Sequence, residues 1–179
     1  MCFWKRAKRA SWHRLSVIGF GGSRSLLSSD GVYAIIRFMN EVVVIDTSIL
    51  ISSLIGPQGP SREILRKCLL GEYSPLISNA LFLEYEDVSQ RKRVLNKCPL
   101  TSDEIRELLN AFYSVCSWIP IYYLWRPNLT DEGDNFLIEL ALAGNATHII
   151  TNNIADLINA ELNFPHLNIV KPQQMLRGK

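Results

Sequence analysis

The hydrophobic pattern is clearest at residues 42–45, where Val-Val-Val-Ile stand together without a polar interruption. A short apolar run of mostly β-branched residues predicts a strand that is covered on both faces, as in a central parallel sheet. Polar residues follow at once, beginning with Asp46, Thr47 and Ser48. In open α/β folds the ligand lies at the carboxyl ends of the parallel strands. The pattern therefore predicts that Asp46 lies at a binding edge of a sheet.

Segments with helix and strand patterns alternate through the rest of the chain. Apolar residues at helical spacing predict amphipathic helices, and short apolar runs between them predict strands. This alternation favours an α/β, three-layer domain with a mostly parallel central sheet flanked by helices. The predicted helices cover 47–55, 61–70, 79–93, 101–116, 130 or 131 to 144, and 153–162, and the predicted strands cover 42–45, 75–77, 118–121, 148–150 and 167–170.

Residues 1–38 differ from residues 39–179 in charge and in periodicity. They carry seven basic residues and one acidic residue, a net charge of +6, whereas residues 39–179 carry a net charge of −4. They show no sustained helix or strand period, so we expect a basic, disordered leader or upstream extension, with the folded domain starting at Met39. A signal peptide, an organellar transit peptide and a nucleic-acid-binding arm are the alternatives.

The composition excludes several classes of protein. At 47% hydrophobic and 20% charged residues it is typical of a globular domain. No apolar stretch approaches the roughly 18 residues of a membrane-spanning helix, so we expect no membrane contact. The four cysteines are widely separated and form no C-x-x-C pair, which favours reduced thiols and a cytoplasmic location. Three scattered histidines argue against a histidine-rich zinc site.

Acidic residues recur at the starts of segments that are far apart in the sequence. Besides Asp46, they are Glu84, Asp131, Asp134 and Asp156. Carboxylates that folding brings together repel one another unless a cation neutralises them. Mg²⁺ and Mn²⁺ prefer such oxygen ligands. Asp131 and Asp134 are three residues apart, so both can face one side of a helix's first turn. The set predicts a metal-dependent enzyme.

These segments, taken in order, resemble the motifs of PIN-domain nucleases. The strand that ends in Asp46 resembles the first motif, Glu84 before a tyrosine resembles the second, and the segment DEGDNFL around Asp134 resembles the third. A strand that ends in Thr151 stands in the place of the fourth motif, Thr-x-Asp. The resemblance covers residues 39 to about 172. It is nearest to the toxin components of bacterial toxin–antitoxin pairs, the VapC-like ribonucleases.

The resemblance implies an activity, partners and ligands. PIN nucleases hold one or two Mg²⁺ or Mn²⁺ ions with their acids, so the implied function is metal-dependent endoribonuclease cleavage of RNA. The implied partners are RNA and a cognate antitoxin protein, with a homodimer as an open option. The implied catalytic residues are Asp46, Glu84 and Asp134, the implied metal ligands are these three with Asp131 and Asp156, and the implied supporting residues are Thr47, Ser48, Thr151 and Asn153.

Position 153 departs from the family pattern, because Asn stands where the motif has Asp. Asn offers a carbonyl oxygen but no charge, so one attraction for a cation is missing, and Asp156 is the candidate to compensate for it. A catalytically weak or inactive PIN-fold binding module is therefore the main alternative function. A phosphatase with Asp46 as nucleophile is more distant, because the chain lacks a second Asp two residues further on.

Some candidate residues also have purely structural explanations. Asp131 can cap a helix, and Glu84 can pair with the basic end of its own helix. Thr47 and Ser48 can cap the helix that follows Asp46.

Basic residues that can contact RNA are sparse in residues 39–179. The dense cluster is Arg91, Lys92 and Arg93, and Arg62 stands beside a Gly/Pro-rich loop. Either can contact an RNA backbone. A solvated helix end is the alternative explanation of the cluster.

Overall fold

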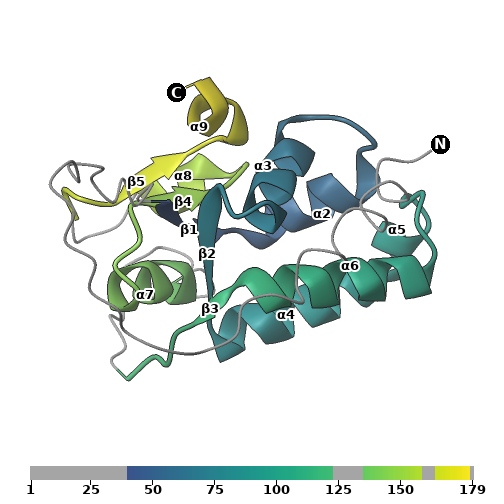
Figure 1. The fold of residues 1–179 in the computed structure, drawn as a ribbon, viewed down its shortest axis with the longest axis horizontal. Coiled ribbons are helices and arrows are strands. Elements are labelled where there is room, and N and C mark those ends of the chain that lie inside the picture. Colours follow the sequence, from purple (N-terminus) through teal and green to yellow (C-terminus); the bar gives the residue numbers. More distant parts are fainter. Residues whose placement is uncertain (1–39, 123–134, 159–163, 178–179) are drawn as a thin grey trace, which may run out of the picture. The chain divides into compact units, whose positions relative to one another are not determined.

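The structure, a computed structural model, describes residues 40–122, 135–158 and 164–177. The strands are β1 (Glu41–Ile45), β2 (Tyr73–Ile77), β3 (Ser117–Trp118), β4 (His148–Ile150) and β5 (Asn168–Val170). The helices are α2 (Thr47–Ile55), α3 (Pro60–Leu69), α4 (Asn79–Gln90), α5 (Lys92–Leu95), α6 (Ser102–Val115), α7 (Asn135–Ala143), α8 (Ile154–Ile158) and α9 (Pro172–Arg177). Among the described residues, the strands form one parallel sheet in the order β3-β2-β1-β4-β5 (Figure 1).

The predicted α/β class and parallel sheet are confirmed, but three segments differ from the prediction. The helix predicted for 79–93 is interrupted at Arg91, whose ψ of 130° lies outside the helical range, so α5 is a separate turn. The strand predicted for 118–121 is reduced to the two residues of β3, and Pro120, which cannot donate to a strand ladder, follows it. Helix α9 was not predicted, because its six residues are too few to show a helical period in the sequence.

Strand β1 is the centre of the sheet and is buried on both faces, as predicted. Its residues Val43, Val44 and Ile45 are at most 1% exposed. β1 pairs with β2 on one side and β4 on the other. Helix α7 packs against β1, β2 and β4, and helix α3 packs against β2; Figure 1 shows α3 and α7 on opposite sides of β2. This double covering explains the unbroken apolar run of β1.

The order of the strands reverses at β1. The chain passes from β1 to β2 and β3 on one side, and then places β4 and β5 on the other. In open α/β sheets, ligands bind at such a switch in strand order, beside the carboxyl ends of the two strands concerned. Asp46 and Thr151 directly follow those ends. The topology thus brings together two polar residues that lie 105 positions apart.

Helix α6 begins with the capping box that its sequence predicts. Thr101 Oγ1 accepts a hydrogen bond from Glu104 N at 3.3 Å, and Glu104 Oε2 accepts one from Thr101 N at 3.0 Å. Two backbone N–H groups at the helix start therefore gain partners.

We expect Thr101→Ala to lower the free energy of unfolding by about 1 kcal/mol, because it removes the acceptor of a capping hydrogen bond. Ser102→Ala is the matched control, since Ser102 is the next residue and is also exposed; we expect its effect to stay within about 0.5 kcal/mol. Urea denaturation measures both values. Equal losses in the two variants would contradict a specific role of the cap.

Two expectations from composition concern cysteines and membrane spans. The described cysteines, Cys68, Cys98 and Cys116, are free thiols. Burial raises the pKa of Cys116 to about 12 and also raises the pKa of Cys68, so neither forms a thiolate at neutral pH. Within the described ranges, every helix is too short or too polar to span a membrane.

Candidate active site

Asp46 is held by its backbone, so that its side chain is available for other contacts. Its N–H donates to Ile150 O of β4 at 3.0 Å, and its carbonyl oxygen accepts from Ile49 N at 2.9 Å. Asp46 is also the N-cap residue of α2, but its side chain makes no capping hydrogen bond. The positive end of the α2 dipole favours a carboxylate at this position.

Two hydroxyl groups donate to the same oxygen of the Asp46 carboxylate. Ser48 Oγ lies 2.5 Å from Asp46 Oδ2, and Thr151 Oγ1 lies 2.6 Å from it. Thr151 is 1% exposed, and its N–H donates to Val170 O of β5 at 3.0 Å, so the sheet fixes its position. From the described residues, no hydrogen bond reaches Asp46 Oδ1. The carboxylate therefore has one oriented oxygen and one oxygen with available lone pairs.

The turn after β4 is bonded to the start of α2. The backbone N–H of Asn152 donates to Ser48 Oγ at 3.2 Å, and its Nδ2 donates to Ser48 O at 3.3 Å and to Ser52 Oγ at 3.1 Å. The N–H of Asn153 donates to Thr151 Oγ1 at 2.9 Å. Asn152 is not identifiable as a site residue from the sequence, because an exposed Asn between a strand and a helix is ordinary turn chemistry.

Glu84 lies on α4, which a buried hydrogen bond ties to the end of β1. The Tyr85 hydroxyl donates to Ile45 O, the carbonyl just before Asp46. Burial raises the pKa of Tyr85 well above its ordinary value, so this hydroxyl keeps its proton. Glu84 immediately precedes Tyr85, is half-buried, and has a buried Oε2 atom.

The other acids of α4 form ion pairs. Glu86 bonds to α6 through Arg106 Nη1 at 2.6 Å and the Tyr113 hydroxyl at 2.9 Å. Asp87 pairs with Arg91 at 2.5 Å and at i, i+4 spacing. Surface pairing along the helix, the structural alternative considered for Glu84, therefore applies to Asp87. Figure 1 shows α4 and α6 side by side, as these bonds require.

Three predicted ligands are not placed by the structure. Asp131 and Asp134 lie outside the residues that the structure describes. Asp156 belongs to α8, but the structure does not describe its side chain. In the described part of the chain, no three His, Cys, Asp or Glu side chains form a group that could hold a metal. Asp46 and Glu84 are the predicted acids whose surroundings are described.

The donors around Asp46 nevertheless fit a hard cation. Mg²⁺ and Mn²⁺ take oxygen ligands, and Asp46 offers a carboxylate oxygen without a partner among the described residues. The neighbouring Thr47 Oγ1 is buried, and no described group bonds to it. A buried hydroxyl without a partner is costly, so a water or a hydrated cation would complete its bonding.

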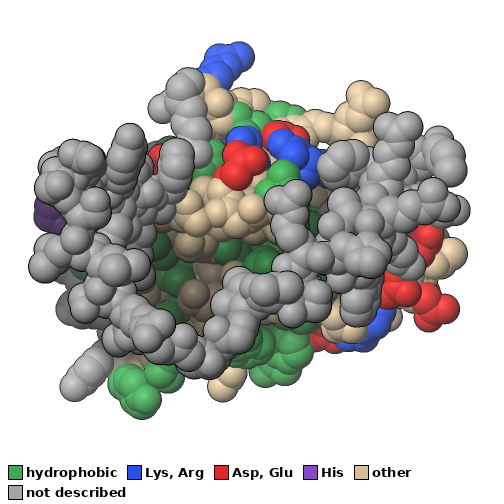
Figure 2. Space-filling view, viewed as in Figure 1, with side chains coloured by type: hydrophobic (Ala, Val, Ile, Leu, Met, Phe, Trp, Pro, Cys, Tyr) green, Lys and Arg blue, Asp and Glu red, His purple; other side chains and the backbone are tan. Residues whose placement is uncertain are grey.

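The predicted RNA-contacting residues are in two different situations. Arg91, Lys92 and Arg93 are exposed around the start of α5. Arg62 is half-buried, and its Nη1 donates to Gly56 O at 2.9 Å, so it supports the loop before α3. Figure 2 shows acidic and basic side chains interspersed among the described residues of the face in view. The described surface in this view has no extended field of positive charge.

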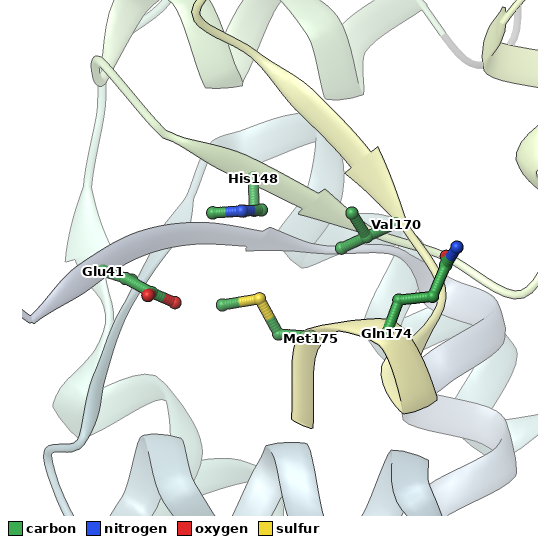
Figure 3. A pocket seen from close by; sticks show the side chains of 5 residues that line it. All are labelled: Glu41, His148, Val170, Gln174 and Met175. Carbon is green, nitrogen blue, oxygen red and sulfur yellow. The ribbon is translucent and has the colours of Figure 1, made fainter. Parts of the chain in front are cut away.

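A pocket lies away from Asp46 and Thr151. Glu41 and His148 are the first residues of β1 and β4, whereas Asp46 and Thr151 follow the last residues of the same strands. The pocket is therefore separate from the candidate site. The residues that line the pocket are Glu41, His148, Val170, Gln174 and Met175 (Figure 3). Gln174 and Met175 belong to α9.

The chain is similar to a family model and to a solved structure among known proteins. No curated protein matches the chain. The solved structure of VapBC2 from Rickettsia felis, bound to a DNA fragment from its promoter, is 17% identical with a TM-score of 0.49, covering 73% of this chain and 98% of that chain. The family model of the PIN domain matches residues 42–155, from β1 into α8. The chain therefore belongs to the PIN-domain family.

Proposed function

We propose that this protein is an endoribonuclease that cleaves RNA phosphodiester bonds with the help of Mg²⁺ or Mn²⁺. The observation that carries the proposal is the Asp46 carboxylate between the carboxyl ends of β1 and β4, with one oxygen held by two hydroxyls and the other available. Membership of the PIN-domain family supports nuclease chemistry at this position.

The proposed catalytic acids are Asp46, Glu84 and Asp134. These acids would hold a divalent cation, which would supply a more acidic bound water and positive charge beside the phosphate oxygens. The residues of the chain bind and orient. Ser48 and Thr151 fix the Asp46 carboxylate through hydrogen bonds to Oδ2. We include Asp131 and Asp156 among the proposed ligands, and Thr47 and Asn153 among the supporting residues.

Asn153 is the observation that favours a second candidate function, a PIN-fold binding module without catalysis. The side chain of Asn153 is exposed and carries no charge, while its N–H bonds to Thr151 Oγ1. We favour catalysis, because this backbone bond supports the orientation of Asp46 whichever side chain stands at position 153.

The biological setting is proposed from the motif resemblance and not from contacts in the structure. We propose that residues 39–179 form the nuclease domain of a cytoplasmic toxin, with residues 1–38 as a basic leader. The partners in this proposal are RNA, a cognate antitoxin protein and, as a further option, a second copy of the chain. Arg62 and residues 91–93 are the proposed contacts to the RNA backbone.

Metal removal tests the proposed function directly. The full-length protein is incubated with single-stranded and structured RNAs in Mn²⁺ or Mg²⁺, with and without EDTA, and products are resolved on denaturing gels. We expect cleavage in either metal, loss of cleavage with EDTA, and recovery on addition of excess Mn²⁺, because the acids alone cannot activate water.

The double variant Asp46→Asn/Asp134→Asn, purified in the same way, controls for contaminating ribonucleases. Cleavage that is equal in the wild type and the double variant would show a contaminant. Absence of cleavage by the wild type on all RNAs in both metals would favour the binding module.

A further inference from the structure

Two hydroxyl groups at the candidate site are fixed in direction by consecutive backbone N–H groups. Ser48 Oγ accepts from Asn152 N at 3.2 Å, and Thr151 Oγ1 accepts from Asn153 N at 2.9 Å. A hydroxyl has a single hydrogen to donate. Because each oxygen receives an N–H on one side, its own hydrogen is directed to Asp46 Oδ2. The turn 151–153 therefore sets the orientation of the carboxylate.

The side chain of Asn152 holds this turn on the first part of α2. Its Nδ2 donates to Ser48 O at 3.3 Å and to Ser52 Oγ at 3.1 Å, and Ser52 Oγ in turn donates to Ser48 O at 2.7 Å. These three bonds close a small network around Ser48. They join α2 to the residue after Thr151, across 104 positions of sequence. Hydrogen bonds therefore hold Ser48 at both its hydroxyl and its carbonyl oxygen.

We propose that Asn152 is a positioning residue for metal binding, which holds Ser48 so that Asp46 presents Oδ1 alone to the cation. This inference rests on the proposed function, because it takes Asp46 to be a metal ligand. In this proposal Asn152 acts through Ser48 and is not itself a ligand of the cation. Its amide is suited to the role, because it supplies two N–H donors without adding charge beside the carboxylate.

The test uses Asn152→Ala in the full chain, with Mn²⁺ binding measured by isothermal titration calorimetry. The variant keeps the backbone N–H that bonds to Ser48 Oγ and removes only the two side-chain bonds. We expect Mn²⁺ to bind about 10-fold to 100-fold more weakly, the usual effect of losing a residue that orients a metal ligand. RNA cleavage should fall at low Mn²⁺ and recover toward wild type as Mn²⁺ is raised, while the melting temperature without metal stays close to that of the wild type.

Asn168→Ala is the matched control. Asn168 is also exposed, and its Nδ2 also donates to a backbone carbonyl, Thr147 O at 3.4 Å, but it begins β5 at the other end of the sheet. We expect wild-type Mn²⁺ affinity in this variant. A second variant, Ser48→Ala, removes the hydroxyl that Asn152 orients, and a similar loss of affinity is expected even where Asn152→Ala folds poorly.

The outcomes separate this inference from the proposed function. Mn²⁺ affinity in Asn152→Ala and Ser48→Ala within about twofold of Asn168→Ala would overturn the inference, even with an active nuclease. Weaker binding in both variants, with no RNA cleavage by the wild type, would support the inference and overturn the proposed function. Wild-type Mn²⁺ binding that Asp46→Asn leaves unchanged would overturn the inference, because the cation would then lie elsewhere.

Discussion

Asp46→Asn is expected to reduce metal-dependent RNA cleavage by more than about 100-fold, beyond the usual cost of losing a residue that only orients a ligand. The reason is chemical, because the two side chains have nearly the same shape. The Asn carbonyl oxygen can still accept from Ser48 and Thr151 at the position of Oδ2. The amide nitrogen then takes the position of Oδ1, where it offers hydrogens to the cation in place of lone pairs.

The measurement is the initial rate of RNA cleavage at a fixed Mn²⁺ concentration, together with calorimetric Mn²⁺ binding. We expect binding to weaken along with the rate, because the variant loses both a charge and a ligand. Its melting temperature without metal should stay close to that of the wild type, since backbone bonds to Ile150 and Ile49 hold position 46.

Asp103→Asn is the matched control for this experiment. Asp103 is an exposed acid in the first turn of α6, so its replacement makes the same chemical change at a residue outside the proposed site. We expect the Asp103→Asn variant to cleave RNA at the wild-type rate. If Asp46→Asn also cleaved RNA at the wild-type rate, with unchanged sensitivity to EDTA, Asp46 would be removed from the proposed mechanism.

Local sequence patterns predict most of the fold because they report burial. The apolar run of β1 indicates a strand covered on both faces, and Val43 and Val44 are fully buried. The capping box at Thr101 marks the start of α6 by a local bond. Elements without such signals are harder to predict. β3 has two residues, and its backbone pairs with β2, so tertiary contacts and not its own period define it.

The candidate site was predictable only in part. Asp46 could be identified because it follows a buried strand, which places it at the edge of the sheet. Its contact with Thr151 depends on the pairing of β1 with β4, which follows from the strand order and not from any local pattern. Asn152 was missed for a related reason. Its role depends on Ser48 and Ser52, which lie 104 and 100 positions away, and nothing in its own segment indicates those partners.

Tyr85→Phe is expected to lower the free energy of unfolding by about 1–3 kcal/mol, the cost of leaving a buried polar group without its partner. The variant keeps the aromatic ring, which packs near Phe112 at 6.1 Å between centroids. It removes only the hydroxyl that donates to Ile45 O. Because that bond joins α4 to the end of β1, its loss should also loosen Glu84 relative to Asp46, and we expect a lower cleavage rate. Urea denaturation gives the stability, and the RNA assay gives the rate.

Tyr122→Phe is the control, because Tyr122 is 81% exposed and its hydroxyl can bond to water. We expect this change to stay within about 0.5 kcal/mol. The comparison isolates the buried bond, since both variants lose one hydroxyl and keep one ring. Equal stability of the two variants would mean that water or another donor satisfies Ile45 O when the Tyr85 hydroxyl is gone. A stability loss in Tyr85→Phe without a change in cleavage would mean that the Tyr85 bond supports the fold but does not position Glu84.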